Sequence, residues 1–209
     1  MMLGASLLGT VLALAAPVSA QGAALLTEEA PYPAVAILDA FKTGCGAIEN
    51  QAAASQSLTA AGWQIADPAF YPTALTQFLV FAQDAGGQAV RAQGGAMSEM
   101  EIFERDIKSE RVFIVLSEVI ANGARVSGCR LFDLGEERRI TLEQAQDWLG
   151  REPLTVVDRE GVLIADWEPG LMPGQDSFQL FFIPSDSPLK QATKFDGVAL
   201  KSDTVGVIE

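Results

Sequence analysis

The spacing of apolar residues changes character partway along the chain. Between residues 34 and 61, and again after Pro72, apolar side chains recur at the spacing of a helix with one buried face. From residue 100 to residue 134 they occupy alternate positions, or both sets of alternate positions, as they do in strands. Helices followed by successive strands, rather than strict alternation of the two, predict an α+β fold.

The first helical segment, residues 34–45, carries one of the two cysteines of the chain. Leu38, Phe41 and Cys45 fall on one face of this helix. We therefore expect Cys45 to extend the buried face, where it could be linked to a neighbouring sheet.

Two further helices are expected before the strands begin. One covers about residues 50–61 and ends at Gly62, which suits the left-handed position after a helix. The next follows Pro72, a favoured residue at a first helical turn. Residues 86–95, bracketed by glycine pairs and poor in large apolar side chains, predict a flexible loop.

The central strands carry the second cysteine. Residues 111–120 are apolar on both faces, which predicts a strand covered on both sides. Asn122-Gly123 predicts a tight hairpin turn into the partner strand, residues 125–134. Cys129 lies in that partner strand, on the face expected to meet the first helix.

The last part of the chain adds one helix and further strands. Thr141 and Gln144 form the pattern of a capping box at the start of a helix, and Gly150 is placed to end it. Strand-like runs separated by turn residues continue through residues 154–203. We expect a single α+β domain over residues 34–209, with a mostly antiparallel sheet of about five to seven strands and helices packed mainly on one face.

The N-terminus has the pattern of an export signal. An apolar run over residues 3–16 is followed by small residues ending at Ala20, which is typical of a signal-peptidase site. We expect residues 1–20 to be removed and residues 21–33 to form a linker; a retained N-terminal anchor is the alternative. No later segment is long and apolar enough to span a bilayer, so we expect a soluble periplasmic or secreted protein without stable membrane insertion.

The charge balance bears on partners. The formal net charge is −13, and residues 1–20 contain no charged side chain, so the whole charge remains on the mature chain. Such a surface repels nucleic acid and anionic lipid headgroups. It is compatible with a cationic partner, although solubility alone also accounts for it.

The two cysteines predict a disulfide. In an exported protein, a single pair of cysteines most often forms one bridge. Linking Cys45 to Cys129 closes a loop of about 84 residues, which the chain-entropy treatment values at roughly 4–5 kcal/mol. A zinc site is not expected, because the chain has no histidine and no C-x-x-C pattern. We expect no cofactor.

The absence of histidine excludes every mechanism that needs an imidazole, including Ser-His and Cys-His catalysis. No catalytic residue is assigned. Ser187 and Lys190 match a short S-x-x-K pattern, and Glu118 is a carboxylate set in an apolar strand, so a Ser-Lys or carboxylate hydrolase remains an alternative. Trp167, beside a Pro-Gly turn at a strand end, is the candidate ligand-binding residue.

Three short patterns resemble those of uncharacterised secreted proteins of Gram-negative bacteria, over about residues 34–200. They are Gly62-Trp63 after a helix, the strand triplet Gly128-Cys129-Arg130, and the strand end Phe182-Ile183-Pro184. The resemblance implies export and carries no activity. We expect a non-catalytic binding or interaction module.

The signal-peptide interpretation predicts the mature N-terminus. Cleavage after Ala20 would leave Gln21 as the first residue of the exported protein. N-terminal sequencing of protein recovered from the periplasm or medium checks this. A chain that still begins at Met1 would instead support a retained anchor.

Overall fold

The structure, a computed structural model, describes residues 30–208, and one compact unit begins at Pro31. The expected signal peptide, residues 1–20, lies outside the described residues, as does most of the expected linker. The fold is therefore that of the predicted mature domain.

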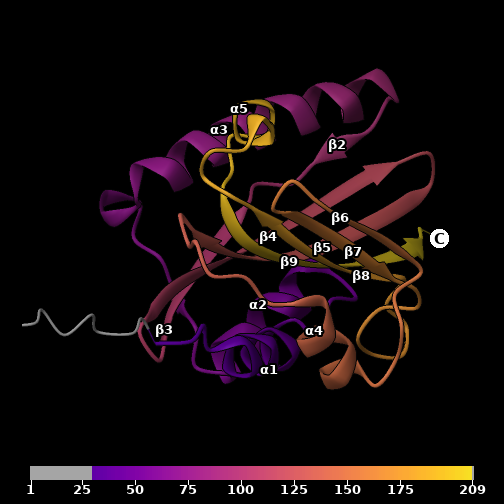
Figure 1. Cartoon of the computed structure of the whole chain (residues 1–209). Helices are drawn as coiled ribbons and strands as arrows, with labels where there is room; N and C mark the ends of the chain where they lie inside the picture. The colour runs from indigo at the N-terminus through magenta and orange to yellow at the C-terminus, as the bar shows by residue number, and fades with distance from the viewer. Residues whose placement is uncertain (1–29, 209) are drawn as a thin grey trace, which may run out of the picture. The chain divides into compact units, whose positions relative to one another are not determined.

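The described residues form five α-helices, one short 3-10 helix and nine strands (Figure 1). The helices are α1 (Ala34–Gly44), α2 (Gln51–Ala60), η1 (Pro68–Phe70), α3 (Thr73–Ala92), α4 (Leu142–Leu149) and α5 (Pro188–Thr193). The strands are β1 (Gln64–Ile65), β2 (Ala96–Met97), β3 (Glu101–Ile107), β4 (Glu110–Ala121), β5 (Ala124–Leu134), β6 (Thr155–Arg159), β7 (Val162–Trp167), β8 (Ser177–Ile183) and β9 (Gly197–Val207).

All nine strands belong to one sheet, and every pairing is antiparallel. The order across the sheet is β1-β3-β4-β5-β9-β8-β7-β6, with β2 paired to β4 beside this path. The α+β class and the antiparallel sheet are confirmed, but the expected count of five to seven strands was too low. The two strands beyond that range, β1 and β2, are two residues long. They are too short to show alternation in a sequence and form only because they pair with β3 and β4.

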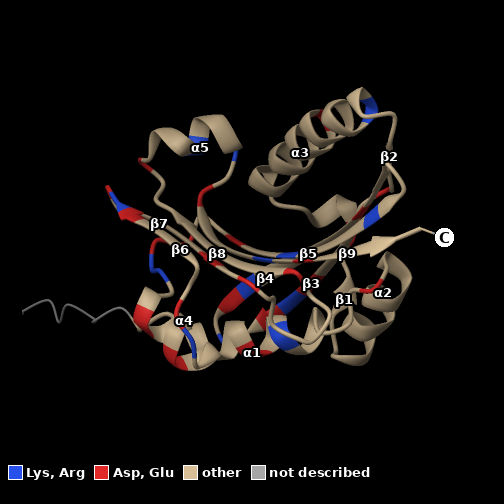
Figure 2. Cartoon of the chain, turned by 90° about the vertical axis from the view of Figure 1, so that its right-hand side faces the viewer, with Lys and Arg blue, Asp and Glu red and all other residues tan. Residues whose placement is uncertain are grey.

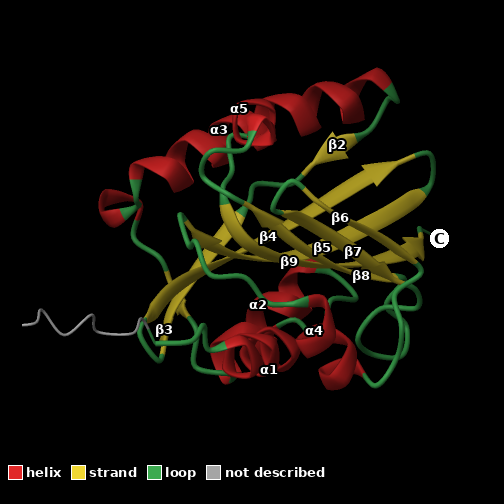
Figure 3. Ribbon diagram, viewed as in Figure 1, coloured by secondary structure: helices red, strands yellow, loops and turns green. Residues whose placement is uncertain are grey.

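The sheet is covered on both faces (Figure 2). Helices α1, α2 and α4 lie on one face, and α3 and α5 lie on the other (Figure 3). This corrects the expectation of helices mainly on one face. The physical reason is the central strand β4, in which Val112 and Ile114 are buried under the first layer and Phe113 and Val115 under the second.

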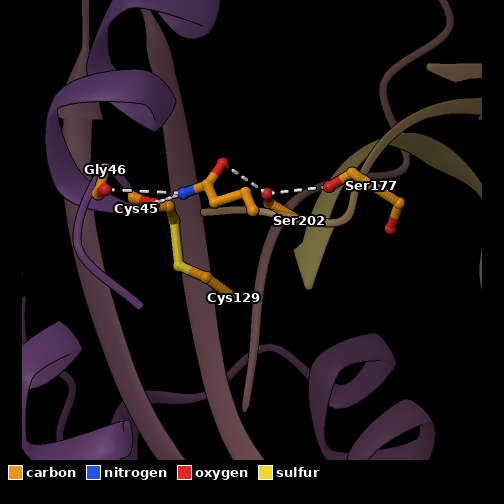
Figure 4. The surroundings of a disulfide bond; sticks show 6 residues. Cys45, Gly46, Cys129, Ser177 and Ser202 are labelled. Atoms are coloured by element: carbon orange, nitrogen blue, oxygen red, sulfur yellow. Dashed lines mark hydrogen bonds between the residues drawn. A yellow bond between two sulfur atoms is a disulfide. The ribbon is translucent and has the colours of Figure 1, made fainter. Parts of the chain in front are cut away.

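The predicted disulfide is confirmed. Cys45 follows α1, Cys129 lies in β5, and their Cα atoms are 5.9 Å apart. Next to this bridge, the buried Gln175 donates from Nε2 to the Cys45 carbonyl oxygen at 2.7 Å and accepts from the Ser202 hydroxyl at 2.9 Å. The Ser202 hydroxyl also lies 2.9 Å from the carbonyl oxygen of Ser177, so its single proton is shared between two acceptors (Figure 4).

The capping box and the tight turn that the sequence predicts are both present in the structure. Thr141 and Gln144 exchange both bonds of a capping box at the start of α4. Asn122 and Gly123 both have positive φ angles, 53° and 74°, as the tight β4–β5 turn requires.

The predicted loop over residues 86–95 is instead mostly helical, because α3 continues to Ala92. The glycine pair lies inside this helix, where a Cβ at position 86 would lie 3.5 Å from the sulfur of Met97 in β2, an ordinary contact distance. The low helix propensity of two glycines therefore does not end the helix here.

The disulfide predicts a large loss of stability when both cysteines are replaced. Cys45→Ala with Cys129→Ala should lower the free energy of unfolding by about 3–5 kcal/mol, because the unfolded chain regains the freedom of the closed loop. Urea denaturation followed by circular dichroism measures this. Reduced wild-type protein should show a similar loss, and equal midpoints for oxidised and reduced protein would contradict a stabilising role.

Candidate functional site

The layer formed by α3 and α5 leaves part of its face of the sheet uncovered. Helix α5 has only six residues. Phe78 of α3, Phe132 of β5 and Phe195, which follows α5, pack together. The ring centroids of Phe78 and Phe132 are 4.5 Å apart, and those of Phe132 and Phe195 are 5.5 Å apart. Beside them lies a half-open recess of about 190 Å³.

The walls of this recess are mainly apolar and come from α3, β5, β8, the end of α5 with the segment after it, and β9. They include Phe78, Phe132, Phe181, Ile183, Phe195 and Ala199. Arg130 and Lys201 complete the lining on one side. The recess itself is apolar, because Arg130 and Lys201 line it only through the carbon atoms of their side chains.

Beside the recess, positively charged side chains outnumber the carboxylates that they contact. The Arg130 guanidinium donates to the hydroxyl of Ser117 at 2.7 Å and lies 3.4 Å from a carboxylate oxygen of Asp203. The ammonium of Lys201 lies 2.7 Å from the other oxygen of the same carboxylate. Burial lowers the pKa of Arg130, and the charge of Asp203 acts in the opposite direction. Two cations therefore share one carboxylate, and one unit of positive charge remains.

Gly128 makes this arrangement possible. A Cβ at position 128 would lie 2.5 Å from Nη1 of Arg130 and 2.9 Å from its Cζ, so the guanidinium lies where any larger residue would stand. The triplet Gly128-Cys129-Arg130 thus serves both faces of the sheet, with the disulfide on one and the guanidinium on the other.

Trp167, the candidate ligand-binding residue, lies in the core. Its side chain is fully buried, its ring centroid is 5.4 Å from that of Phe178, and its Nε1 donates to the carbonyl of Arg151 at 3.2 Å. The ring is therefore packed inside the protein and is not open to solvent. The alternation of β7 turns Trp167 to the same face as Leu163 and Ala165, under the first helical layer.

Ser187 and Lys190 are engaged with different partners. The Ser187 hydroxyl caps the start of α5 by accepting from the N–H of Leu189 at 3.3 Å. The ammonium of Lys190 binds a carboxylate oxygen of Asp196 at 3.0 Å. In this geometry the lysine is not placed to activate the serine.

Glu118 holds two elements together. Its carboxylate accepts from the N–H of Gln51 at the start of α2, at 3.2 Å, and from the hydroxyl of Ser127 at 3.3 Å. The guanidinium of Arg125 lies 3.3 Å from its second oxygen. These partners account for a carboxylate in this strand without a catalytic role.

Sequence reasoning missed a cluster of three carboxylates. Carboxylate oxygens of Glu110, Asp133 and Glu136 all lie within 4.8 Å of one another. Tyr32, from the segment before α1, donates to Asp133 at 2.9 Å across 101 positions of sequence. No spacing in the sequence indicates this group, because β4, β5 and the N-terminal segment meet only in the fold.

One cation of the chain itself is bonded to two of these carboxylates. The guanidinium of Arg138 donates to Glu110 at 2.9 Å and to Glu136 at 2.7 Å. Carboxylates at this spacing could hold a calcium ion, but Arg138 already bonds Glu110 and Glu136. We assign the cluster a structural role, joining the segment before α1 to the end of β5.

The pKa values in the cluster follow from burial and hydrogen bonds. Burial raises the pKa of Asp133 from 3.8 to about 7, with Glu110 and Glu136 adding to the rise and Tyr32 and Arg138 opposing it. Burial alone would raise the pKa of Glu136, but the bonds from Arg138 lower it below its usual value. Burial and the charge of Asp133 raise the pKa of the Tyr32 hydroxyl.

Comparison with known protein-family models, curated proteins and solved structures found no match. Within residues 30–208, no helix has both the length and the apolar character that a bilayer crossing needs. The recess beside α3 and α5 and the carboxylate cluster are therefore judged on their own geometry.

Asp133 predicts a particular dependence of stability on pH. Because its pKa is raised in the folded state, the folded chain holds a proton that the unfolded chain loses between about pH 4 and pH 7, so stability falls over that interval. Asp133→Asn keeps an acceptor for Tyr32 and does not titrate. At pH 8 the variant should be more stable than wild type by about 1–3 kcal/mol, with little difference at pH 4.

Urea denaturation at both pH values measures this difference. Asp158→Asn is the control, since it removes a carboxylate from an exposed ion pair with Arg139 and should change stability by less than about 1 kcal/mol. Parallel pH profiles for wild type and Asp133→Asn would contradict the assignment.

Proposed function

We propose that this chain is an exported, non-catalytic binding module, acting in the periplasm or outside the cell, whose site is the recess between α3 and α5. Export is supported by the disulfide between Cys45 and Cys129, since such bonds persist in oxidising compartments. The signal-peptide pattern of residues 1–20 supports it independently.

The observation that carries the binding function is the apolar recess itself. Its volume, about 190 Å³, is close to that of an engineered cavity of about 150 Å³ that binds benzene. One aromatic ring or a short aliphatic chain fills such a space. Covering the exposed faces of Phe78 and Phe181 with a ligand is favourable by about 25 cal/mol for each Å² of apolar surface removed from water.

The rim favours an acidic head group. Arg130 and Lys201 share the single carboxylate of Asp203, so an anion placed above the recess would meet a local excess of positive charge. The ligand class that fits both features is a small carboxylic acid with an apolar body. Local charge of this sign stands out in a chain of net charge −13.

The hydrolase alternative has less support. Ser187 and Lys190 have separate partners, and the carboxylate cluster around Asp133 is filled by Tyr32 and Arg138. Neither group faces the recess.

The proposal predicts binding of a small aromatic acid. Titration of isotope-labelled protein with 3-phenylpropionate should produce saturable NMR shifts around Phe132 and Ala199. The neutral analogue 3-phenylpropanol should bind about two- to five-fold more weakly, because it lacks the charge that Arg130 and Lys201 attract. Hexanoate tests whether an aliphatic body serves equally well.

A recess-filling variant provides the matched control. Ala199→Leu places three more carbon atoms in the recess and should weaken binding about ten-fold or more. Val205→Leu adds one methylene on the same strand at an exposed position and should leave binding unchanged. The proposal fails if none of the three probes gives saturable shifts, or if Ala199→Leu binds as tightly as wild type.

A further inference from the structure

Helix α5 lies in a loop whose two ends are held together. The loop, residues 184–196, connects β8 to β9, and Ile183 and Gly197 beside its ends are paired across these two strands. A compact surface loop with adjacent ends is an Ω-loop, a form that frequently carries function.

Both ends of this loop are anchored to the segment that follows β5. At one end the Ser185 hydroxyl donates to the carboxylate of Glu137 at 3.1 Å. At the other end the carbonyl of Asp196 accepts from the N–H of Gly135 at 3.0 Å. These bonds fix the base of the loop.

Between these anchors the loop bonds only to itself. The Thr193 hydroxyl lies 2.8 Å from the carbonyl oxygen of Leu189, and the ammonium of Lys190 binds the carboxylate of Asp196 at 3.0 Å. Over the described part of the chain, each hydrogen bond and ion pair of residues 186–195 has both partners inside the loop. The polar groups would therefore keep their partners if this segment moved as one body.

One large apolar side chain holds the loop to the rest of the fold. Phe195 is 4% exposed, and its ring centroid lies 5.5 Å from that of Phe132 and 6.1 Å from that of Phe78. No residue of α5 itself is buried, and Leu189 is 38% exposed. Phe195 therefore makes most of the apolar contact between this loop and the sheet.

The side of α5 that faces α3 has room beside it. The two helices cover the same face of the sheet (Figure 2), and an open hollow of about 770 Å³ separates them. Ala74 and Gln77 line this hollow from α3, and Lys190 and Lys194 line it from the loop. The loop is thus not packed against α3 along this side.

The side chain that holds the loop is also a wall of the recess. Phe195 and Thr193 line the recess from the loop, while Phe78 and Phe132 line it from α3 and β5. Moving the loop outward would carry the first two walls away and leave the other two in place. The recess would then be open on the side of α5.

We propose that residues 186–195 are a flap that opens and closes the recess, with Phe195 as the latch that also limits the size of the ligand. The role of the recess in binding rests on the proposed function, whereas the latch is testable without a ligand. Opening exposes one buried phenyl ring and breaks no hydrogen bond to the rest of the described chain, so the flap should open far more often than the sheet unfolds.

Hydrogen exchange followed by NMR tests the latch first. The amides of Lys190 and Lys194 are bonded within the loop, at 3.1 and 2.8 Å, and the amide of Leu200 in the central strand β9 is the reference. Phe195→Ala should speed exchange of both flap amides about ten-fold or more, by similar factors, because they open together. Low concentrations of urea should change these two rates little, since local opening exposes little surface.

Two further variants serve as controls. Phe70→Ala removes a phenyl ring that is 69% exposed in η1 and should leave both flap rates within about two-fold of wild type. Phe195→Leu keeps an apolar latch, should give a smaller increase, and remains informative if the alanine variant does not fold. Flap rates that are unchanged in both Phe195 variants would overturn the latch, as would wild-type flap amides that exchange as slowly as that of Leu200.

A ligand then tests control of the recess. Saturating 3-phenylpropionate should slow exchange of both flap amides in wild type about five-fold or more, because a ring in the recess contacts the closed Phe195. The larger acid 3-(2-naphthyl)propionate should bind Phe195→Ala about ten-fold more tightly than it binds wild type, because the missing phenyl ring leaves space for it.

These results separate the flap from the binding function. If neither acid binds wild type or Phe195→Ala, the binding role of the recess fails and with it the control of ligand size, while exchange without ligand still decides the latch. If 3-phenylpropionate binds without slowing the flap amides, or the naphthyl acid does not favour Phe195→Ala, the recess stands as a binding site and the flap does not control it.

Discussion

The disulfide between Cys45 and Cys129 joins the end of α1 to the middle of the sheet, and the arrangement of both faces depends on it. Alternate residues of a strand face opposite sides, so holding Cys129 towards α1 turns Gly128 and Arg130 towards the recess. A slip of one residue would exchange these sets. The guanidinium would then lie under α1, away from Asp203. The cross-link therefore sets the register of β5 for both layers.

The two layers differ in how completely they cover the sheet. Helices α1, α2 and α4 bury their face, whereas α3 and the short α5 leave the recess between them, and neither layer reaches β6. Apolar surface left open to water is where partners bind. Beside the recess, Arg130 and Lys201 share the carboxylate of Asp203.

Features with a local cause were predictable from the sequence. The capping box at Thr141 and the turn at Asn122-Gly123 involve neighbouring residues, so their side-chain and backbone chemistry is readable without the fold. The disulfide was predictable because two cysteines allow only one pairing, which the expected export favours. Alternation in β4 indicated a strand covered on both faces, although the expected arrangement assigned helices mainly to one of them.

Tertiary structure decided what depends on residues that are distant in sequence. The strands β1 and β2 exist through their pairing, and α3 continues past Gly86 to Ala92. Trp167 is buried because the first helical layer covers its face of β7. The bond from Tyr32 to Asp133 spans 101 positions, and the walls of the recess come from α3, β5, β8, α5 and β9. The sequence by itself determined the compartment expected for the chain, its α+β class and its cross-link. Only the fold decided where apolar surface and charge remain open, because that is set by which elements cover one another in space.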